Sequence, residues 1–139
     1  DSLEFQPWDE MEEGLPSVTY LKVDRAEAEF LTGLTDIRQA CEKLTSMGPK
    51  EILLTQSSGV TVYAEGVFHE APFTPRSLAG RTGRGDTCFS AYIAKRLSED
   101  AQTACQWAGV ITSLKQETPG PWKGTAGEVE AILMKRRMP

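Results

Sequence analysis

A glycine-rich stretch, Leu78–Phe89, constrains this chain more than any other feature. It contains three glycines within six residues, Gly80, Gly83 and Gly85, and it leads into apolar residues at helical spacing. Glycine lets a backbone approach a ligand closely because it has no Cβ. The first N–H groups of a helix are unpaired and lie at the positive end of its dipole. The stretch therefore predicts an anion site at a helix start, where phosphate is the usual ligand.

A carboxylate, Asp86, follows the last of these glycines. The pattern Gly80-x4-Gly85-Asp86-Thr87 has the spacing of a Walker A loop, with Asp at the position of the lysine. A carboxylate does not bind a phosphate, but it can accept a proton from a hydroxyl that attacks one. This pattern predicts phosphoryl transfer to an alcohol, with Asp86 as the base. On spacing alone the alternative stays open that Asp86 is an ordinary first-turn helix residue, which the helix dipole favours.

Composition narrows the class of protein. A length of 139 residues predicts one domain, and a net charge of −5 argues against nucleic acid as a partner. The three cysteines, Cys41, Cys88 and Cys105, are far apart on apolar helix faces, so we expect small buried thiols in a reducing cytoplasm and neither disulfides nor zinc ligands. No run of residues has transmembrane length, so no membrane contact is expected.

The order of apolar patterns predicts an α/β sheet covered on both faces. Residues 1–16 form an acidic segment that we expect on the surface. The predicted elements are a strand at 17–23, helices at 26–31 and 36–47, a strand at 51–55, an edge hairpin of 60–63 and 67–70 around Glu65-Gly66, and helices at 86–97, at 99–115 and after Thr125. Phe89, Tyr92, Ile93 and Leu97 are expected to share the apolar face of the helix at 86–97, and Ser98 to cap the next helix. That helix has a stripe of mostly small apolar residues that predicts close packing: Ala101, Ala104, Cys105, Ala108 and Ile111.

Two acids follow the first predicted strand. Asp24 and Glu27 have the spacing of a capping box, in which each side chain accepts a hydrogen bond from the other residue's backbone. The functional alternative is a pair of acids at a strand-to-helix turn, near a metal-bound phosphate. The two roles are compatible for Asp24 but compete for the carboxylate of Glu27. The pair Thr125 and Glu128 predicts a second capping box at the final helix.

Three stretches in order resemble the C-terminal half of the ribokinase-like (PfkB) sugar kinases. Residues 81–89 (RTGRGDTCF) resemble the family signature Asp-Thr-x-Gly-Ala-Gly-Asp-x-Phe, and residues 24–33 (DRAEAEFLTG) resemble Asn-x-x-Glu-Ala-x-x-Leu-Thr-Gly. Residues 52–55 with Gly59 and Val60 are similar to the strand and turn that border the nucleotide. The resemblance runs from about residue 17 to residue 133 and implies a partial three-layer αβα sandwich.

The resemblance also implies roles for single residues. It implies that Asp86 is the catalytic base and that Gly83, Arg84 and Gly85 form the anion hole for the γ-phosphate of ATP. Thr55 and Gly59 would lie near the nucleotide. Glu27 and Asp24 would organise Mg²⁺ through water. The implied reaction is ATP-dependent phosphorylation of a sugar or related small polyol, which requires alignment and charge stabilisation more than covalent participation.

Three departures from the family pattern bear on the site. Gly80 stands where the first Asp of the signature is expected, Arg84 replaces Ala, and Asp24 replaces Asn. Arg84 would place a cation at the anion hole, where it would contact phosphate or point to solvent. None of these departures removes the base or the glycines of the anion hole.

The family's first half, which binds the sugar, has no match here, so we expect the chain to be part of a longer kinase that is inactive when this part is isolated. A non-catalytic nucleotide-binding or interaction module derived from such a kinase is the alternative. The acceptor, the nucleotide preference, a monovalent cation and the oligomeric state, homo-oligomers included, stay open.

Overall fold

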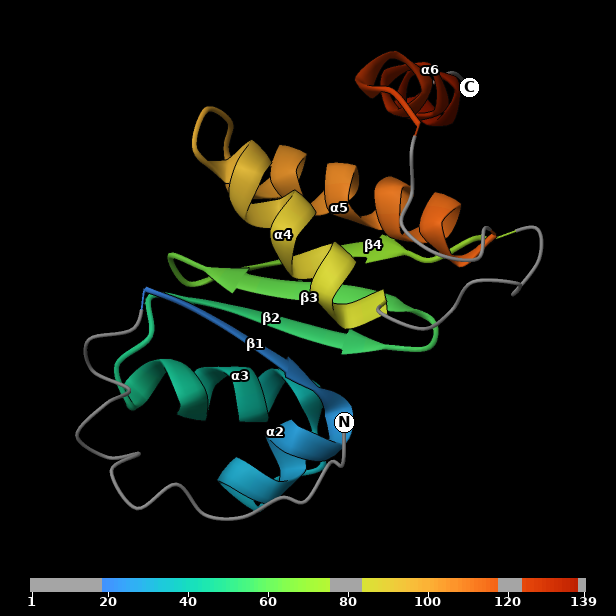
Figure 1. Ribbon diagram of the computed structural model, residues 1–139. Helices are drawn as coiled ribbons and strands as arrows, with labels where there is room; N and C mark the ends of the chain where they lie inside the picture. Colours follow the sequence, from blue (N-terminus) through green and yellow to red (C-terminus); the bar gives the residue numbers. More distant parts are fainter. Residues whose placement is uncertain (1–18, 76–83, 118–123, 138–139) are drawn as a thin grey trace. The chain divides into compact units, whose positions relative to one another are not determined.

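The computed structural model describes residues 19–75, 84–117 and 124–137. Within these ranges the chain forms four strands in one sheet of order β1-β2-β3-β4, together with five helices (Figure 1). The strands are β1 (Tyr20–Asp24), β2 (Glu51–Gln56), β3 (Gly59–Ala64) and β4 (Val67–Pro72), and the helices are α2 (Arg25–Thr32), α3 (Ile37–Ser46), α4 (Arg84–Arg96), α5 (Ala101–Gln116) and α6 (Ala126–Arg137).

The sheet is mixed. β1 pairs in parallel with β2, in a register that sets Tyr20 beside Glu51 and Asp24 beside Thr55. β2, β3 and β4 follow one another through two-residue turns, which join antiparallel neighbours. The second turn places both Glu65 (φ 52°) and Gly66 (φ 78°) in the left-handed region, as the tight hairpin turns that match strand twist require.

By its contacts the chain divides into two compact units. The first comprises residues up to Gln56 together with Thr61–Phe68. Here α2 and α3 connect the parallel strands β1 and β2. Their apolar faces pack into a core whose buried members are Val23, Ala28, Ala40, Cys41, Leu44, Ile52 and Leu54.

Local signals set the ends of both helices of this unit. Asp24 caps α2, which stops at Gly33, where the backbone turns left-handed (φ 72°) and the Gly33 N–H donates to the Glu29 carbonyl. Asp36 caps α3 by accepting a hydrogen bond from the Gln39 N–H at 2.8 Å. These ends agree with the predicted helices to within one residue.

The second unit comprises Ser57–Val60 and the chain from His69 onward. α4 packs along α5, and the Lys95 ammonium lies 3.9 Å from the centre of the Trp107 ring. α5 also contacts α6, through a cluster formed by Val110, Ile111, Val129 and Leu133. The predicted stripe of small residues on α5 is confirmed, because Ala101, Ala104, Cys105, Ala108 and Ile111 are all buried.

Three details of the sequence prediction are wrong. Leu97 is 79% exposed, because α4 ends at Arg96, and Cys88 takes a buried place on this helix. Ser98 does not cap α5. Asp100 does, since its carboxylate accepts a hydrogen bond from the Thr103 N–H at 2.8 Å, and this bond lowers the pKa of Asp100. The predicted helix therefore begins later than expected, at Ala101.

The predicted hairpin lies at the edge of the sheet, as expected, and β4 is its outer strand. β3 lies between β2 and β4 and is buried along most of its length.

Candidate active site

The acid pair Asp24 and Glu27 forms a complete capping box. The Glu27 N–H donates to Asp24 Oδ1 at 2.7 Å, and the Asp24 N–H donates to Glu27 Oε1 at 2.8 Å. The structural reading of this pair is thereby confirmed. The box uses one oxygen of each carboxylate, so the second oxygen of each can still accept a hydrogen bond from water.

Thr55 lies beside this pair. It is the register partner of Asp24 across the parallel strands and is only 2% exposed. The fold thus gathers three predicted site residues, Asp24, Glu27 and Thr55, where β1 and β2 reach their carboxyl ends. Ligands of open α/β sheets bind outside the carboxyl ends of the strands.

Gly59, at the start of β3, has a packing reason to be glycine. A Cβ on this residue would lie 2.4 Å from the Ala71 carbonyl oxygen and 3.1 Å from the Pro72 Cα, both of them backbone atoms. No side chain fits that space without a shift of β4. Its predicted place near the nucleotide stays a prediction.

The predicted base lies in the first turn of α4. Asp86 is exposed there, and Arg84 and Gly85 precede it within the same turn, where backbone N–H groups have no helical partner. Cys88 and Tyr92, fully buried, hold the same helix in the core. Gly83, the remaining residue of the predicted anion hole, lies outside the described residues, as do Gly80 and the acidic segment 1–16.

The described residues fit Mg²⁺ only indirectly. Within 19–75, 84–117 and 124–137 no three side chains of His, Cys, Asp or Glu cluster closely enough to bind a metal ion together. Mg²⁺ commonly keeps several of its waters and is bound through one or two carboxylates together with substrate phosphates. The second carboxylate oxygens of Asp24 and Glu27 suit such contacts through water.

Two buried thiols supply no nucleophile. Burial raises the pKa of Cys41 to about 12, with a smaller effect of the Glu42 carboxylate. Burial also raises the pKa of Cys105 to about 12, helped by Cys88 and Glu70. Both thiols therefore stay protonated at neutral pH and behave as small apolar groups. The prediction that the three cysteines are buried and form no disulfide is confirmed.

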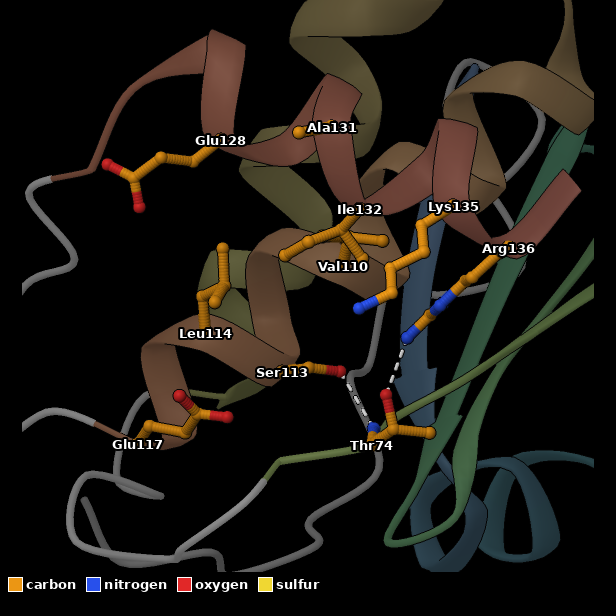
Figure 2. A pocket seen from close by; sticks show the side chains of 10 residues that line it. All are labelled: Thr74, Val110, Ser113, Leu114, Glu117, Glu128, Ala131, Ile132, Lys135 and Arg136. Carbon is orange, nitrogen blue, oxygen red and sulfur yellow. Dashed lines mark hydrogen bonds between the residues drawn. The ribbon is translucent and has the colours of Figure 1, made fainter. Parts of the chain in front are cut away.

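A polar link that the sequence patterns missed joins the segment after β4 to two helices. The Thr74 N–H donates to Ser113 Oγ of α5 at 2.8 Å, and Arg136 of α6 donates to Thr74 Oγ1 at 2.5 Å (Figure 2). The residues are 39 and 62 positions apart, so no local motif announces the link. The sequence offered no specific signal, because Ser113 is one of several polar residues that are buried on α5, with Thr112, Lys115 and Gln116.

The same link borders a cavity of about 600 Å³ between α5 and α6 (Figure 2). Val110 and Leu114 line it from α5, and Ala131 and Ile132 line it from α6. The predicted site residues within the described ranges are not among its lining residues. The cavity therefore gives no support to the predicted site.

No helix in the described part of the chain has both the length and the apolar character needed to cross a bilayer. This finding agrees with the sequence, which contains no run of transmembrane length.

Solved structures resemble this chain closely. A pyrophosphate-dependent kinase of the ribokinase family, complexed with a pyrophosphate analogue and myo-inositol, is 41% identical, with a TM-score of 0.79 over 89% of this chain and 45% of its own. A pyrophosphate-dependent myo-inositol-1 kinase converted by mutation into a myo-inositol-3 kinase is 40% identical, with a TM-score of 0.80 over 93% of this chain and 46% of its own. A ribokinase II candidate from E. coli, in complex with ATP and Mg²⁺, is 23% identical, with a TM-score of 0.77 over 91% of this chain and 42% of its own.

These structures confirm the predicted ribokinase-like αβα fold in partial form. The chain spans less than half the length of the solved structures that it matches. A comparison with curated protein sequences gave no match.

The family model described as pfkB family carbohydrate kinase matches residues 2–123. The match starts earlier than the resemblance seen from about residue 17, so most of the acidic N-terminal segment belongs to the family's pattern. It covers most of the chain and includes the acid pair, Thr55, Gly59 and the complete glycine-rich stretch. The chain is therefore a member of the pfkB family of carbohydrate kinases.

Proposed function

We propose that this chain is the donor-side half of a kinase that transfers a phosphoryl group to a hydroxyl of a small polyol. The observation that carries the proposal is the position of Asp86, exposed in the first turn of α4 and within the matched family range. A base must reach the acceptor hydroxyl, and an exposed carboxylate beside unpaired N–H groups is suited to do so.

In the proposed reaction the acceptor hydroxyl gives its proton to the Asp86 carboxylate as its oxygen attacks the terminal phosphorus of the donor. The phosphorus–oxygen bond of the phosphate anhydride breaks, and the leaving phosphate or ADP keeps the electron pair. The N–H groups of the first turn, together with Gly83, Arg84 and Gly85, stabilise the charge on the transferred group. When bound, Mg²⁺ would neutralise the donor's phosphate charge, with Asp24 and Glu27 holding its waters.

The donor is open between ATP, which the family resemblance implies, and pyrophosphate. A specific observation favours pyrophosphate: the two pyrophosphate-dependent relatives are about 40% identical to this chain, whereas the relative solved with ATP and Mg²⁺ is 23% identical. Both donors present a terminal phosphoryl group on an anhydride oxygen, so the proposed base and anion hole serve either one. We therefore propose pyrophosphate as the preferred donor and a polyol such as myo-inositol as the acceptor class.

The test uses the longer enzyme that contains this chain, assayed with pyrophosphate and with ATP against a panel of polyols and sugars. Asp86→Asn keeps the size of the side chain but cannot take a proton. We expect it to lower kcat by about 100- to 10,000-fold, with donor binding and the unfolding midpoint nearly unchanged. The matched control is Asp100→Asn, an exposed helix-start acid of the same unit that has no proposed catalytic role.

Full turnover in Asp86→Asn would remove Asp86 as the base. Donor binding without transfer to any acceptor in the unmodified protein would favour the non-catalytic module. Faster turnover with ATP than with pyrophosphate would reverse the donor assignment and leave the reaction class in place.

A further inference from the structure

The segment that leads into the glycine-rich stretch is held tightly on α5. The last residues of β4 and those after it run Ala71-Pro72-Phe73-Thr74-Pro75, and the glycine-rich stretch begins three positions later in the sequence, at Leu78. The Phe73 N–H donates to the Ser58 carbonyl at 3.0 Å, and the Thr74 N–H donates to Ser113 Oγ at 2.8 Å. Backbone donors therefore tie this segment down at two consecutive residues.

Ser113 is suited to hold this segment because its hydroxyl both donates and accepts a hydrogen bond. It is 4% exposed, donates to the Gly109 carbonyl at 2.8 Å and accepts the Thr74 N–H. A hydroxyl with one donated and one accepted bond has a fixed orientation. Loss of this oxygen would leave the partly buried Thr74 N–H without its acceptor, which costs more than the average hydrogen bond contributes.

Close packing reinforces the link one turn earlier in α5. A Cβ on Gly109 would lie 2.8 Å from the Ala71 Cβ and 3.3 Å from the Pro72 carbonyl oxygen. The absent side chain lets the end of β4 lie directly against the helix. Ser113 and Gly109 are one helical turn apart, so they form one contact surface for this segment.

The other end of the glycine-rich stretch is held by the same helix. The stretch runs into α4, which packs along α5 and places Asp86 in its first turn. Cys88 and Tyr92 of α4 are fully buried, and Lys95 stacks on Trp107 of α5. α5 thus contacts the segment before the stretch and the helix after it.

We propose that α5 is a common platform for the two ends of the glycine-rich stretch, here called the phosphate loop, and that Ser113 is the positioning residue that sets where this loop starts. This inference rests on the proposed function, since it assigns the loop to the phosphoryl donor. Ser113 acts through the Thr74 backbone. A displaced loop start misaligns the N–H donors of the anion hole, and catalysis is sensitive to shifts of about 1 Å.

Arg136 supports the same link from outside. It is exposed, and its guanidinium donates to Thr74 Oγ1, so it contacts the loop start without belonging to the core (Figure 2). Arg136→Met should therefore weaken the link without risk to the fold. Its neighbour Lys135 lines the same cavity and is a matched control for loss of one positive charge.

The experiment uses the longer enzyme with the donor that the activity assay identifies. We expect Ser113→Ala to lower kcat/KM for the donor about tenfold, with KM for the acceptor unchanged, and to speed amide exchange of the peptide containing Thr74 about tenfold. Arg136→Met should lower kcat/KM for the donor, and speed amide exchange at Thr74, by about threefold each. The control Thr112→Val removes a neighbouring buried hydroxyl that donates only within its own helix, to the Ala108 carbonyl. It should change neither kcat/KM for the donor nor the amide exchange at Thr74. Lys135→Met should likewise leave both quantities unchanged.

All kinetics are measured well below the unfolding midpoints, so that loss of stability alone changes no rate. Faster exchange at Thr74 with unchanged donor kinetics in Ser113→Ala would overturn the positioning role. Unchanged exchange, or equal effects of Thr112→Val, would overturn the link itself. An unmodified enzyme that transfers no phosphoryl group would instead refute the proposed function, and the exchange reading would still decide whether Ser113 anchors Thr74.

Discussion

At the scale of single residues, Glu27 carries a structural role that is established and a functional role that is proposed. Its Oε1 completes the capping box with Asp24, and this contact explains the residue without any ligand. The proposed contact with the waters of Mg²⁺ would use the other carboxylate oxygen. A substitution that keeps the cap and removes the charge separates the two roles.

Glu27→Gln is that substitution, because Gln also serves in a capping box. We expect the free energy of unfolding to fall by less than about 0.5 kcal/mol, since the change leaves the cap in place. In the longer enzyme, the Mg²⁺ concentration that gives half-maximal activity should rise about tenfold, as typical losses on changing groups around a metal site suggest. Urea unfolding and a magnesium titration measure the two effects.

The matched control is Glu128→Gln. Glu128 accepts the Thr125 N–H at 3.3 Å, and Thr125 Oγ1 accepts the Glu128 N–H at 3.3 Å, so the α6 box repeats the arrangement without a proposed metal contact. It should leave the magnesium response unchanged. If the two variants respond identically to magnesium, Glu27 acts only as a helix cap and the proposed metal contact is wrong.

At the scale of elements, the contact of β3, β4 and α5 depends on two glycines. Gly59 of β3 and Gly109 of α5 both face Ala71 of β4, where a Cβ on either would come closer than 3.0 Å to an Ala71 atom. At Gly59 the obstacle is backbone, so a side chain there requires the strands to separate. The identity of Gly59 thus follows from packing whether or not a nucleotide lies nearby.

Gly59→Ala should therefore destabilise the protein by about 1–3 kcal/mol, the usual cost of overpacking. The control is Gly127→Ala in α6, where the new Cβ would meet nothing closer than 3.8 Å and Ala favours the helix. That variant should gain about 0.5–1 kcal/mol. Equilibrium unfolding in urea compares them. A Gly59→Ala protein as stable as the unmodified one would show that the strands accommodate the methyl group.

At the scale of the whole molecule, the chain supplies less than half of the length of its solved relatives. Positioning of two reactants contributes roughly 7–11 kcal/mol to catalysis. A half that supplies only the proposed base and phosphate contacts would lack a positioned acceptor. We therefore expect residues 1–139 in isolation to bind a donor weakly at most and to phosphorylate no polyol.

Product formation by the isolated chain and by the longer enzyme can be compared under identical conditions, after circular dichroism has established that the isolated chain is folded. We expect the longer enzyme to form product and the isolated chain to form none. Phosphorylation of a simple polyol by the folded isolated chain at ordinary kinase rates would refute the division into donor and acceptor halves.

Features that depend on neighbours within a few positions could be predicted from the order of residues alone. The two capping boxes, the turn at Glu65-Gly66 and the end of α2 at Gly33 follow from side chains or backbone angles that act over one turn. The glycine-rich stretch with Asp86 and the acid pair likewise identified the family, because their meaning lies in fixed local spacing. Helical periodicity predicted the buried face of α5 for the same reason.

Which surfaces are covered could not be predicted in this way, since burial depends on partners that are distant in the chain. β3 has a neighbour on each side, Leu97 is exposed beyond the end of α4, and Asp100 rather than Ser98 caps α5. Ser113 became a candidate positioning residue only when the fold brought Thr74 within 2.8 Å of it across 39 positions. A hydroxyl in a sequence has many available partners, and the packing of β4 on α5 selects one.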